Sequence, residues 1–203
     1  MLVFAALCGY LTTDRTAMEV AAPLLLGTVL MAGGAMALNQ VLEMKGDALM
    51  RRTRMRPLPS RAVSMPVAVG FGLGISCMGV LLLAVWTTVA AAGFAVLAWV
   101  LYLFFYTPLK RVSRASVFIG AAAGALPPVI GSAAAGVLDW QAAWLFAMLF
   151  AWQIPHVFAI AQAHRDDYLR AGIKTPQRWV AVVFAVLLAG LVLAMPWVFG
   201  SGN

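Results

Sequence analysis

Asn39, Glu43 and Asp47 follow one another at four-residue spacing in the stretch NQVLEMKGDALMRRTRMRPLPSR. On a helix that turns by about 100° per residue, they fall within roughly 80° of each other and share one face. An apolar run over residues 21–38 enters this stretch, so the polar face lies at the edge of a membrane segment. A carboxylate pair of this kind can hold Mg²⁺, and Mg²⁺ together with arginines can hold a diphosphate.

A basic segment comes directly after the acidic face, and Pro57 then stops any helix. Its arginines are Arg51, Arg52, Arg54 and Arg56. Taken alone, they have an ordinary interpretation, because basic loops beside membrane helices set topology. The whole pattern favours a functional interpretation, because polar groups aligned on one face of a membrane helix are usually functional.

A second polar cluster ends another apolar stretch, in the sequence QIPHVFAIAQAHRDDYLR. If the helix there continues to Tyr168, His156 and Asp167 are eleven residues apart and share a face within about 20°. His164 and Asp166 then lie about 80° to either side. Two interpretations of His156 stay open: a packed, hydrogen-bonded residue or a functional group inside the membrane.

Together the two acidic clusters predict a diphosphate site. Each cluster could hold its own Mg²⁺ ion, while Lys110, Arg111 and the loop arginines donate hydrogen bonds to phosphate oxygens. Such a site stabilises the charge that grows on a diphosphate leaving group. The apolar interior would then hold an isoprenoid chain, with aromatic faces near a carbocation that is kept from water.

The elements that must position these groups are membrane helices. The 203 residues are 64% hydrophobic and 10% charged, with a mean hydropathy of +0.94. That composition excludes a soluble domain of this size. Long apolar runs with little alternation favour helices over a barrel. Cys8 and Cys77 lie in apolar runs and indicate neither a disulfide nor a metal site.

The net charge of +7 does not indicate nucleic acid, because of how the charge is distributed. Apart from Arg15, the basic residues lie in three short segments, 45–61, 110–114 and 165–178. The loops between them carry almost no positive charge, which is the positive-inside pattern. We therefore expect the three basic loops on the cytoplasmic face of a bacterial membrane, or on the matrix face of the mitochondrial inner membrane.

We expect an all-α polytopic transmembrane bundle of about seven helices, forming one domain over residues 1–203. The double proline, Pro127 and Pro128, should kink the fifth helix and make it border a central cavity. The aromatic segment 101–106 is either an interface belt or the wall of an apolar cavity. The expected segments are a partial helix at 1–12, a helix from about 20 into the acidic face, and helices near 66–86, 89–106, 116–138, 144–163 and 179–199.

The chain resembles the UbiA superfamily of intramembrane prenyltransferases, and within it the protohaem IX farnesyltransferase branch, also called haem O synthases. The segments that carry the resemblance are NQVLEMKGDALMRRTRMRPL, YTPLKRVS, GALPPVIG and IPHVFAIAQAHRDDYLRAG, over most of residues 39–172. The acidic motif alone indicates only the superfamily. The RTxxRPL element, the double proline and the PH…DY element together are specific to the haem branch.

The resemblance implies Mg²⁺-dependent transfer of a farnesyl group from farnesyl diphosphate to a vinyl group of haem b, giving haem O for haem-copper oxidase assembly. It implies a lipid bilayer, and oxidase-assembly proteins as partners. The roles it implies are catalytic for Asn39, Glu43, Asp47 and Asp167; metal-binding for Glu43, Asp47, Asp166 and Asp167; diphosphate-binding for Arg52, Arg56, Lys110 and Arg111; and haem-binding for His156.

Other interpretations stay open beside this one. One is a UbiA-type prenyltransferase acting on a quinone precursor, another is an inactive haem-binding homologue, and a weaker one is a small transporter with broken helices. The family has about nine helices, at about 20 residues for each span. We therefore expect the start of the first helix and the last two helices to be absent from this chain.

Overall fold

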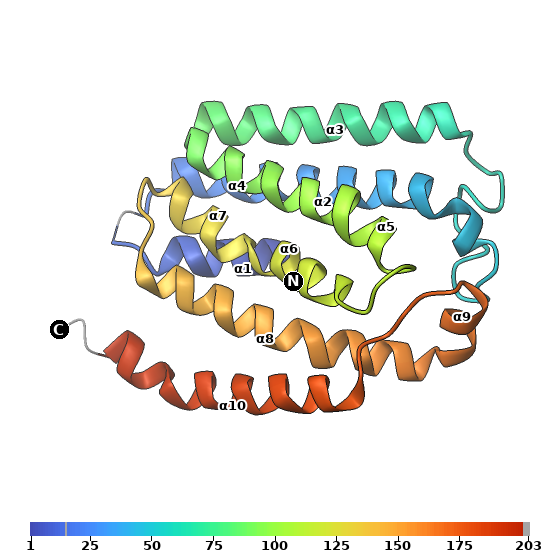
Figure 1. The fold of residues 1–203 in the computed structure, drawn as a ribbon. Coiled ribbons are helices and arrows are strands. Elements are labelled where there is room, and N and C mark those ends of the chain that lie inside the picture. The colour runs from blue at the N-terminus through green and yellow to red at the C-terminus, as the bar shows by residue number, and fades with distance from the viewer. Residues whose placement is uncertain (15, 201–203) are drawn as a thin grey trace.

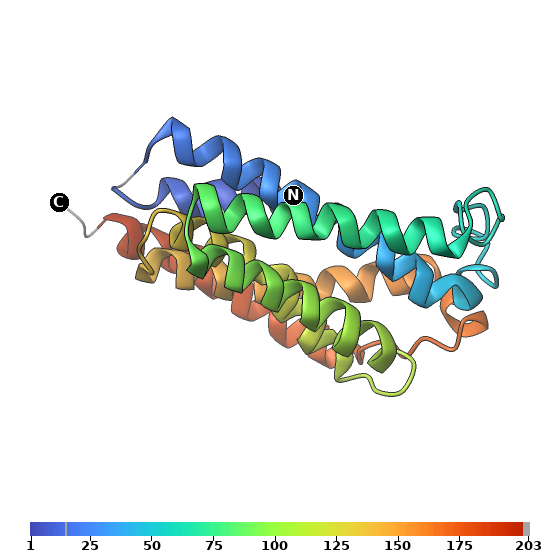
Figure 2. The same ribbon diagram turned by 90° about the horizontal axis from the view of Figure 1, so that it is seen from above.

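The computed structural model describes residues 1–14 and 16–200, and every regular element in that part of the chain is helical. The long helices lie side by side and run between two ends of the molecule, with short connections at each end (Figure 1; Figure 2). Within the described residues, six helical segments are long and apolar enough to cross a membrane. The predicted all-α membrane bundle is therefore confirmed, and the protein is an integral membrane protein.

The first helix of the chain packs against a distant helix through small residues. α1 (Leu2–Leu11) lies against α7 (Pro127–Ala134), and a Cβ atom added to Gly131 would overlap the carbonyl oxygen of Ala6. Since backbone atoms occupy that position, only glycine allows the two helices to approach so closely.

α2 (Met18–Asp47) is the helix that carries the acidic face. It packs along α3 (Met65–Trp86), and its last turn lies at the end of the molecule opposite the α1–α2 turn (Figure 1). The predicted start near residue 20 and the predicted end in the acidic face both agree with the structure, within the usual uncertainty of helix ends.

The third span, Val89–Leu109, changes its winding along its length. A π-helical segment adds about one residue per turn and is often found at functional sites. The aromatic residues of this segment divide between two environments: Tyr102 and Tyr106 line an internal cavity, whereas Phe104 and Phe105 are exposed. The parts of the span are α4 (Val89–Val100), η1 (Leu101–Tyr106) and α5 (Thr107–Leu109).

The double proline divides the predicted helix 116–138 into two. α6 (Ser116–Ala125) ends at Ala125, Leu126 follows as its C-cap, and α7 begins at Pro127 and ends at Ala134. Each proline ring clashes with the preceding helical turn, and each proline lacks a backbone N–H donor. The helix is therefore interrupted at this point, and the predicted kink is confirmed.

The next helix begins four residues earlier than the expected start near Trp144. α8 (Trp140–Ala163) starts after Asp139, whose Oδ1 accepts a hydrogen bond from the backbone N–H of Ala142 at 2.8 Å. This is an N-cap, and it satisfies one of the free donors in the first helical turn. The last span is α10 (Arg178–Gly200), which lies on the outside of the bundle against α8 (Figure 1).

The predicted end of this helix near Ala163 is confirmed, and the condition under which His156 and Asp167 would share a face, continuation to Tyr168, is not met. α8 ends at Ala163, His164 has φ −122° and ψ 35°, and α9 (Arg165–Arg170) is a separate short helix. His156 and Asp167 therefore do not share one helical face. The connections after α2, after α5 and after α8 nevertheless lie together at one end of the bundle, which is where the three basic segments meet (Figure 1).

Candidate active site at the end of α2

The polar face of α2 is buried against neighbouring helices. Asn39, Glu43 and Asp47 keep only 7%, 5% and 1% of their surfaces exposed. Two carboxylates one helical turn apart in so small a space repel each other and lose hydration, so each needs a cationic or hydrogen-bonding partner. The structure supplies those partners from two other segments of the chain.

A chain of hydrogen bonds joins α2 to the end of the third span. The Thr107 hydroxyl donates to Asn39 Oδ1 at 2.8 Å, and Asn39 Nδ2 donates to Glu43 Oε2 at 2.9 Å. Lys110 Nζ meets Glu43 Oε1 at 2.5 Å, and it also lies 5.5 Å from the ring centre of Tyr106. Asn39 therefore orients the Glu43 carboxylate, while Lys110 balances its charge.

Asp47 is held differently. Arg56 Nη1 donates to its Oδ2 at 2.9 Å, and the Thr53 hydroxyl donates to its backbone carbonyl at 2.9 Å. These contacts fold the chain after α2 back over the end of the helix. Asp47 Oδ1, by contrast, is buried and has no hydrogen-bond partner among the described residues. An unpaired buried carboxylate oxygen is costly, and it is available to a cation.

Arg111 contacts the same part of α2, at a position where a glycine leaves room for its guanidinium group. A Cβ atom added to Gly46 would overlap Nη2 of Arg111, so the guanidinium lies directly against the backbone of α2. Gly46 is buried and stands between Glu43 and Asp47 in the sequence. The structure thus brings together five of the predicted residues, Glu43, Asp47, Arg56, Lys110 and Arg111.

Asp167 comes to the same end of the bundle but binds backbone groups. Its Oδ1 accepts from the N–H of Arg51 at 3.0 Å, and its Oδ2 accepts from the N–H of Arg52 at 3.2 Å. The Arg51 amide is the main cause that holds the pKa of Asp167 below its ordinary value. Asp167 is therefore an anchor for the connection after α2, a role that its residue type alone did not indicate.

Tyr168 also lies at this end of the bundle. It is part of the PH…DY element, but the sequence predicted no role for its side chain. Burial raises its pKa, the Arg52 guanidinium lowers it, and the Glu43 carboxylate raises it. The phenol therefore lies within range of both charges, between the acidic face of α2 and the basic connection. Asp166, its neighbour Arg165 and the Arg52 side chain are exposed, away from the buried carboxylates.

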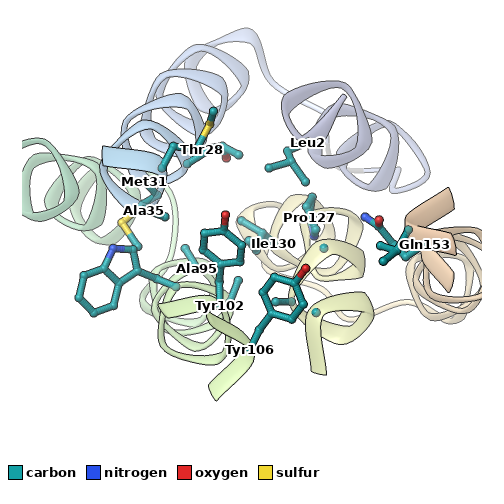
Figure 3. A pocket seen from close by; sticks show the side chains of 18 of the residues that line it. Leu2, Thr28, Met31, Ala35, Ala95, Tyr102, Tyr106, Pro127, Ile130 and Gln153 are labelled. Atoms are coloured by element: carbon teal, nitrogen blue, oxygen red, sulfur yellow. The ribbon is translucent and has the colours of Figure 1, made fainter. Parts of the chain in front are cut away.

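An apolar chamber of about 380 Å³ lies inside the bundle. Its wall comes from α1, α2, α4, η1, α6, α7 and α8, and residues from these helices point into it (Figure 3). The stacked rings of Tyr102 and Tyr106, 5.8 Å apart, form part of this wall. A Cβ atom on Gly120 would meet the Tyr106 ring at 2.7 Å, so that glycine makes room for the ring.

The chamber and the acidic face are built on two shared elements. α2 contributes Met31 and Ala35 to the chamber wall and, further along the same helix, Glu43 and Asp47 to the polar site. The third span contributes Tyr106 to the chamber and Lys110 to the polar site. A molecule with an anionic head and an apolar tail would match this arrangement.

His156 lies beside this chamber rather than among its lining residues. Gln153 and Val157 of the same helix line the chamber, while His156 is half-buried and stacks on Trp152 at 4.3 Å between ring centres. Gln153 also lies tightly against Gly124 of α6, where an added Cβ would overlap its amide nitrogen. The haem-binding role of His156 stays a prediction.

The residues at the end of α2 suit a divalent cation that shares its ligands with a substrate. Among the described residues, there is no group of three or more acidic, histidine or cysteine side chains that could bind a metal ion by itself. Mg²⁺ does not need one, because it usually binds one or two carboxylates together with water and substrate phosphates. Glu43 and the free Oδ1 of Asp47 fit that requirement, whereas Asp166 and Asp167 are not brought into the same pair.

Comparisons with known proteins agree with this arrangement. The UbiA prenyltransferase family matches residues 2–203. A protein of Sorangium cellulosum named protoheme IX farnesyltransferase is 40% identical over 95% of this chain and 73% of its own length. A mitochondrial protoheme IX farnesyltransferase of Arabidopsis thaliana is 43% identical over 73% of this chain and 35% of its own length.

The fold has a counterpart among solved structures. The apo structure of a UbiA homologue from Aeropyrum pernix K1 matches all of this chain and 79% of its own length, with a TM-score of 0.79 at 19% identity. This match concerns the fold, while the sequence matches concern the family. The chain therefore belongs to the UbiA prenyltransferase family.

Proposed function

We propose that this chain transfers a farnesyl group from farnesyl diphosphate to a vinyl group of haem b. The single observation that carries the proposal is that a charged site, built from Glu43, Asp47, Arg56 and Lys110, and an apolar chamber share the helix α2. The names of the relatives support the identity of both substrates. The chain spans 73% and 35% of the lengths of those two relatives.

In this proposal the charged site binds the diphosphate. Glu43 and Asp47 would hold Mg²⁺, which supplies positive charge to the leaving group. Arg56 and Lys110 pair with these carboxylates in the structure and would turn to the phosphate oxygens when the substrate arrives. Arg111, held against Gly46, would donate to the same oxygens without having to leave a carboxylate.

The chamber would hold the isoprenoid chain. Its wall is mainly apolar, so burial of the chain there is favourable and water is excluded from the reacting carbon. As the bond between that carbon and the diphosphate oxygen breaks, the oxygen takes the electron pair and the carbon becomes cationic. The faces of Tyr102 and Tyr106 would stabilise that charge until the vinyl group supplies the electrons for the new bond. The other vinyl carbon would then become cationic beside the porphyrin ring, and a water molecule would add to it and lose a proton, so that the product carries a hydroxyl group.

The basic connections support an orientation in the membrane. They gather at one end of the bundle, and by the positive-inside rule that end would face the cytoplasm in a bacterial membrane or the matrix in the mitochondrial inner membrane. The haem would approach at this end, near His156, and oxidase-assembly proteins would be the receivers of the product.

The test is turnover by the detergent-solubilised chain with farnesyl diphosphate and haem b. Mass spectrometry of the extracted porphyrin should show a farnesylated product that requires Mg²⁺ and is lost in Glu43→Gln. Glu19→Gln is the matched control, because Glu19 is an exposed glutamate on the first turn of the same helix. Prenylation of a quinone precursor instead of haem would contradict the acceptor, and haem binding without any product would contradict catalysis by this chain.

A further inference from the structure

A second hollow, of about 520 Å³, lies at the basic end of the bundle, and its lining residues are all different from those of the chamber. It is formed by the connection after α2 and by the α8–α9 turn. Four of the lining residues are arginines, against two carboxylates. The arginines are Arg51, Arg52, Arg165 and Arg170.

The charges in this hollow are only partly balanced. Both oxygens of Asp167 accept backbone N–H groups, and one of them lies 3.8 Å from Nη2 of Arg170. For Arg51, Arg52 and Arg165, the described part of the chain offers their guanidinium groups neither a hydrogen bond nor an ion pair. The hollow therefore has a surplus of positive charge, with free donors exposed to water.

The backbones that carry these arginines are fixed. Asp167 holds the amides of two of them, Arg51 and Arg52, and α9 starts directly after the bend at His164 with the third, Arg165. A guanidinium that starts from a fixed backbone loses less freedom when it binds, so the hollow is partly organised before a ligand arrives.

The proposed reaction brings two different anions to this end of the bundle. One is the diphosphate, for which Arg56, Lys110 and Arg111 are placed beside the acidic face of α2. The other is the acceptor, because haem b carries two propionate groups on the part of its rim away from the vinyl groups. Like charges repel, so the two anions require separate groups of cations.

We propose that the hollow lined by Arg51, Arg52, Arg165 and Arg170 binds the paired carboxylates of the porphyrin acceptor. This inference rests on the proposed function. The planar fork of arginine matches a carboxylate, and several forks in one hollow match two carboxylates on one rigid ring. Arg52 then belongs to the acceptor site, whereas the resemblance of the chain to the family implies that Arg52 contacts the diphosphate.

The test measures the affinity of the detergent-solubilised chain for zinc protoporphyrin IX and for its dimethyl ester by fluorescence titration. In the double variant Arg51→Gln/Arg165→Gln, the dissociation constant for the free acid should rise by about tenfold, because charge-assisted hydrogen bonds are lost. The dissociation constant for the ester should stay the same in wild type and variant. The KM for farnesyl diphosphate should also stay the same.

A matched control removes the same charge elsewhere. Arg114→Gln/Arg178→Gln neutralises two exposed arginines that do not line the hollow, and it should leave both affinities unchanged. Equal weakening of the acid and the ester in the first double variant would overturn the proposal, as would unchanged affinity for the acid. If the Arg51→Gln/Arg165→Gln variant loses bound anionic lipid but keeps its affinity for the free acid, the hollow binds lipid phosphates. That result would overturn the proposal as well.

This experiment separates the inference from the proposed function. If the wild-type chain binds neither porphyrin and prenylates another acceptor, the proposed function is wrong. If the wild-type chain farnesylates haem b and the double variant binds the free acid equally well, only the assignment of the hollow is wrong.

Discussion

Asp167 Oδ1 accepts a hydrogen bond from the backbone N–H of Arg51 at 3.0 Å, across 116 residues of sequence. The adjoining N–H of Arg52 binds the other oxygen of the same carboxylate. The short helix α9 thereby holds the connection that leaves α2, and this connection also carries Arg56 to Asp47. The position of one side chain therefore determines how the acidic face is covered.

Acidification should release this anchor. The pKa of Asp167 lies below its ordinary value, mainly because the N–H of Arg51 stabilises the charged form. A lowered pKa means that the contact contributes stability above the ordinary carboxyl pKa, near 4, and loses it as pH falls through the lowered value. Hydrogen exchange at the Arg51 and Arg52 amides, corrected for intrinsic rates, should therefore accelerate only in acid.

The control for this prediction is Asp167→Asn. Its side chain has one acceptor oxygen, so it cannot hold both amides as the carboxylate does. Exchange at Arg51 and Arg52 should be fast already at neutral pH and should lose its pH dependence. Amides that stay protected in this variant would show that other contacts hold the connection.

Gly46→Ala should weaken binding of the prenyl diphosphate. The new methyl group would overlap the guanidinium of Arg111 and push it off the backbone of α2. If Arg111 donates to the diphosphate, we expect KM for this substrate to rise about tenfold, the usual cost of a hydrogen bond to a charged group. Thermal stability should not fall, because alanine has the higher helix propensity.

Gly70→Ala on α3 is the control for this change, since a Cβ there meets nothing within 4 Å. Arg111→Gln should raise KM to a similar extent, and combining it with Gly46→Ala should add little. Fully additive effects of the two changes would mean that Gly46 acts without Arg111.

Asp47→Asn should separate stability from activity. The carboxylate is 1% exposed, and its Oδ1 has no partner among the described residues, so neutralising it removes a cost of burial. We expect the free energy of unfolding in detergent to stay within about 1 kcal/mol or to rise. Turnover should fall about 100-fold or more if this oxygen holds the catalytic cation.

Two measurements decide this prediction. Thermal unfolding followed by circular dichroism reports stability, and the rate of product formation as a function of Mg²⁺ concentration reports the cation site. An Asp47→Asn variant that keeps the wild-type rate and the wild-type Mg²⁺ dependence would remove Asp47 from the metal site. An unfolded variant would be replaced by Asp47→Glu, which keeps the charge and moves the oxygens.

Ala35→Leu should shorten the prenyl chain that the chamber accepts. Ala35 lines the chamber and lies eight residues before Glu43, which is about 12 Å along α2. A larger side chain there meets the distal part of a long isoprenoid first. The ratio of kcat/KM for farnesyl diphosphate to that for geranyl diphosphate should therefore fall. Ala22→Leu, at an exposed position of the same helix, should leave the ratio unchanged.

Several features of the fold follow directly from the sequence. The spacing of Asn39, Glu43 and Asp47 predicts a common face, and all three are buried together in the structure. The double proline predicts the division between α6 and α7. In both cases the information is local, because it depends on residues within one or two helical turns.

Other features depend on partners that are distant in the sequence. The predicted end of the helix near Ala163 is local information, but the pairing of Asp167 with amides 115 and 116 residues away is not. Gly46 is visible in the sequence as a glycine, but its neighbour Arg111 is not. A residue type indicates which bonds a side chain can make, whereas tertiary structure decides which ones it makes.

The π-helical winding of η1 makes the number of residues in this span as important as their types. Tyr102 and Tyr106 face the chamber, while Thr107 and Lys110, a few positions later, must still face α2. Insertion or deletion of one residue in the ordinary helical turns on either side of η1 would turn Lys110 by about 100° relative to the tyrosines. The types of the outward side chains of Phe104 and Phe105 therefore matter less than the number of residues between the chamber and Lys110, because that number sets how the chamber wall and the charged site face each other.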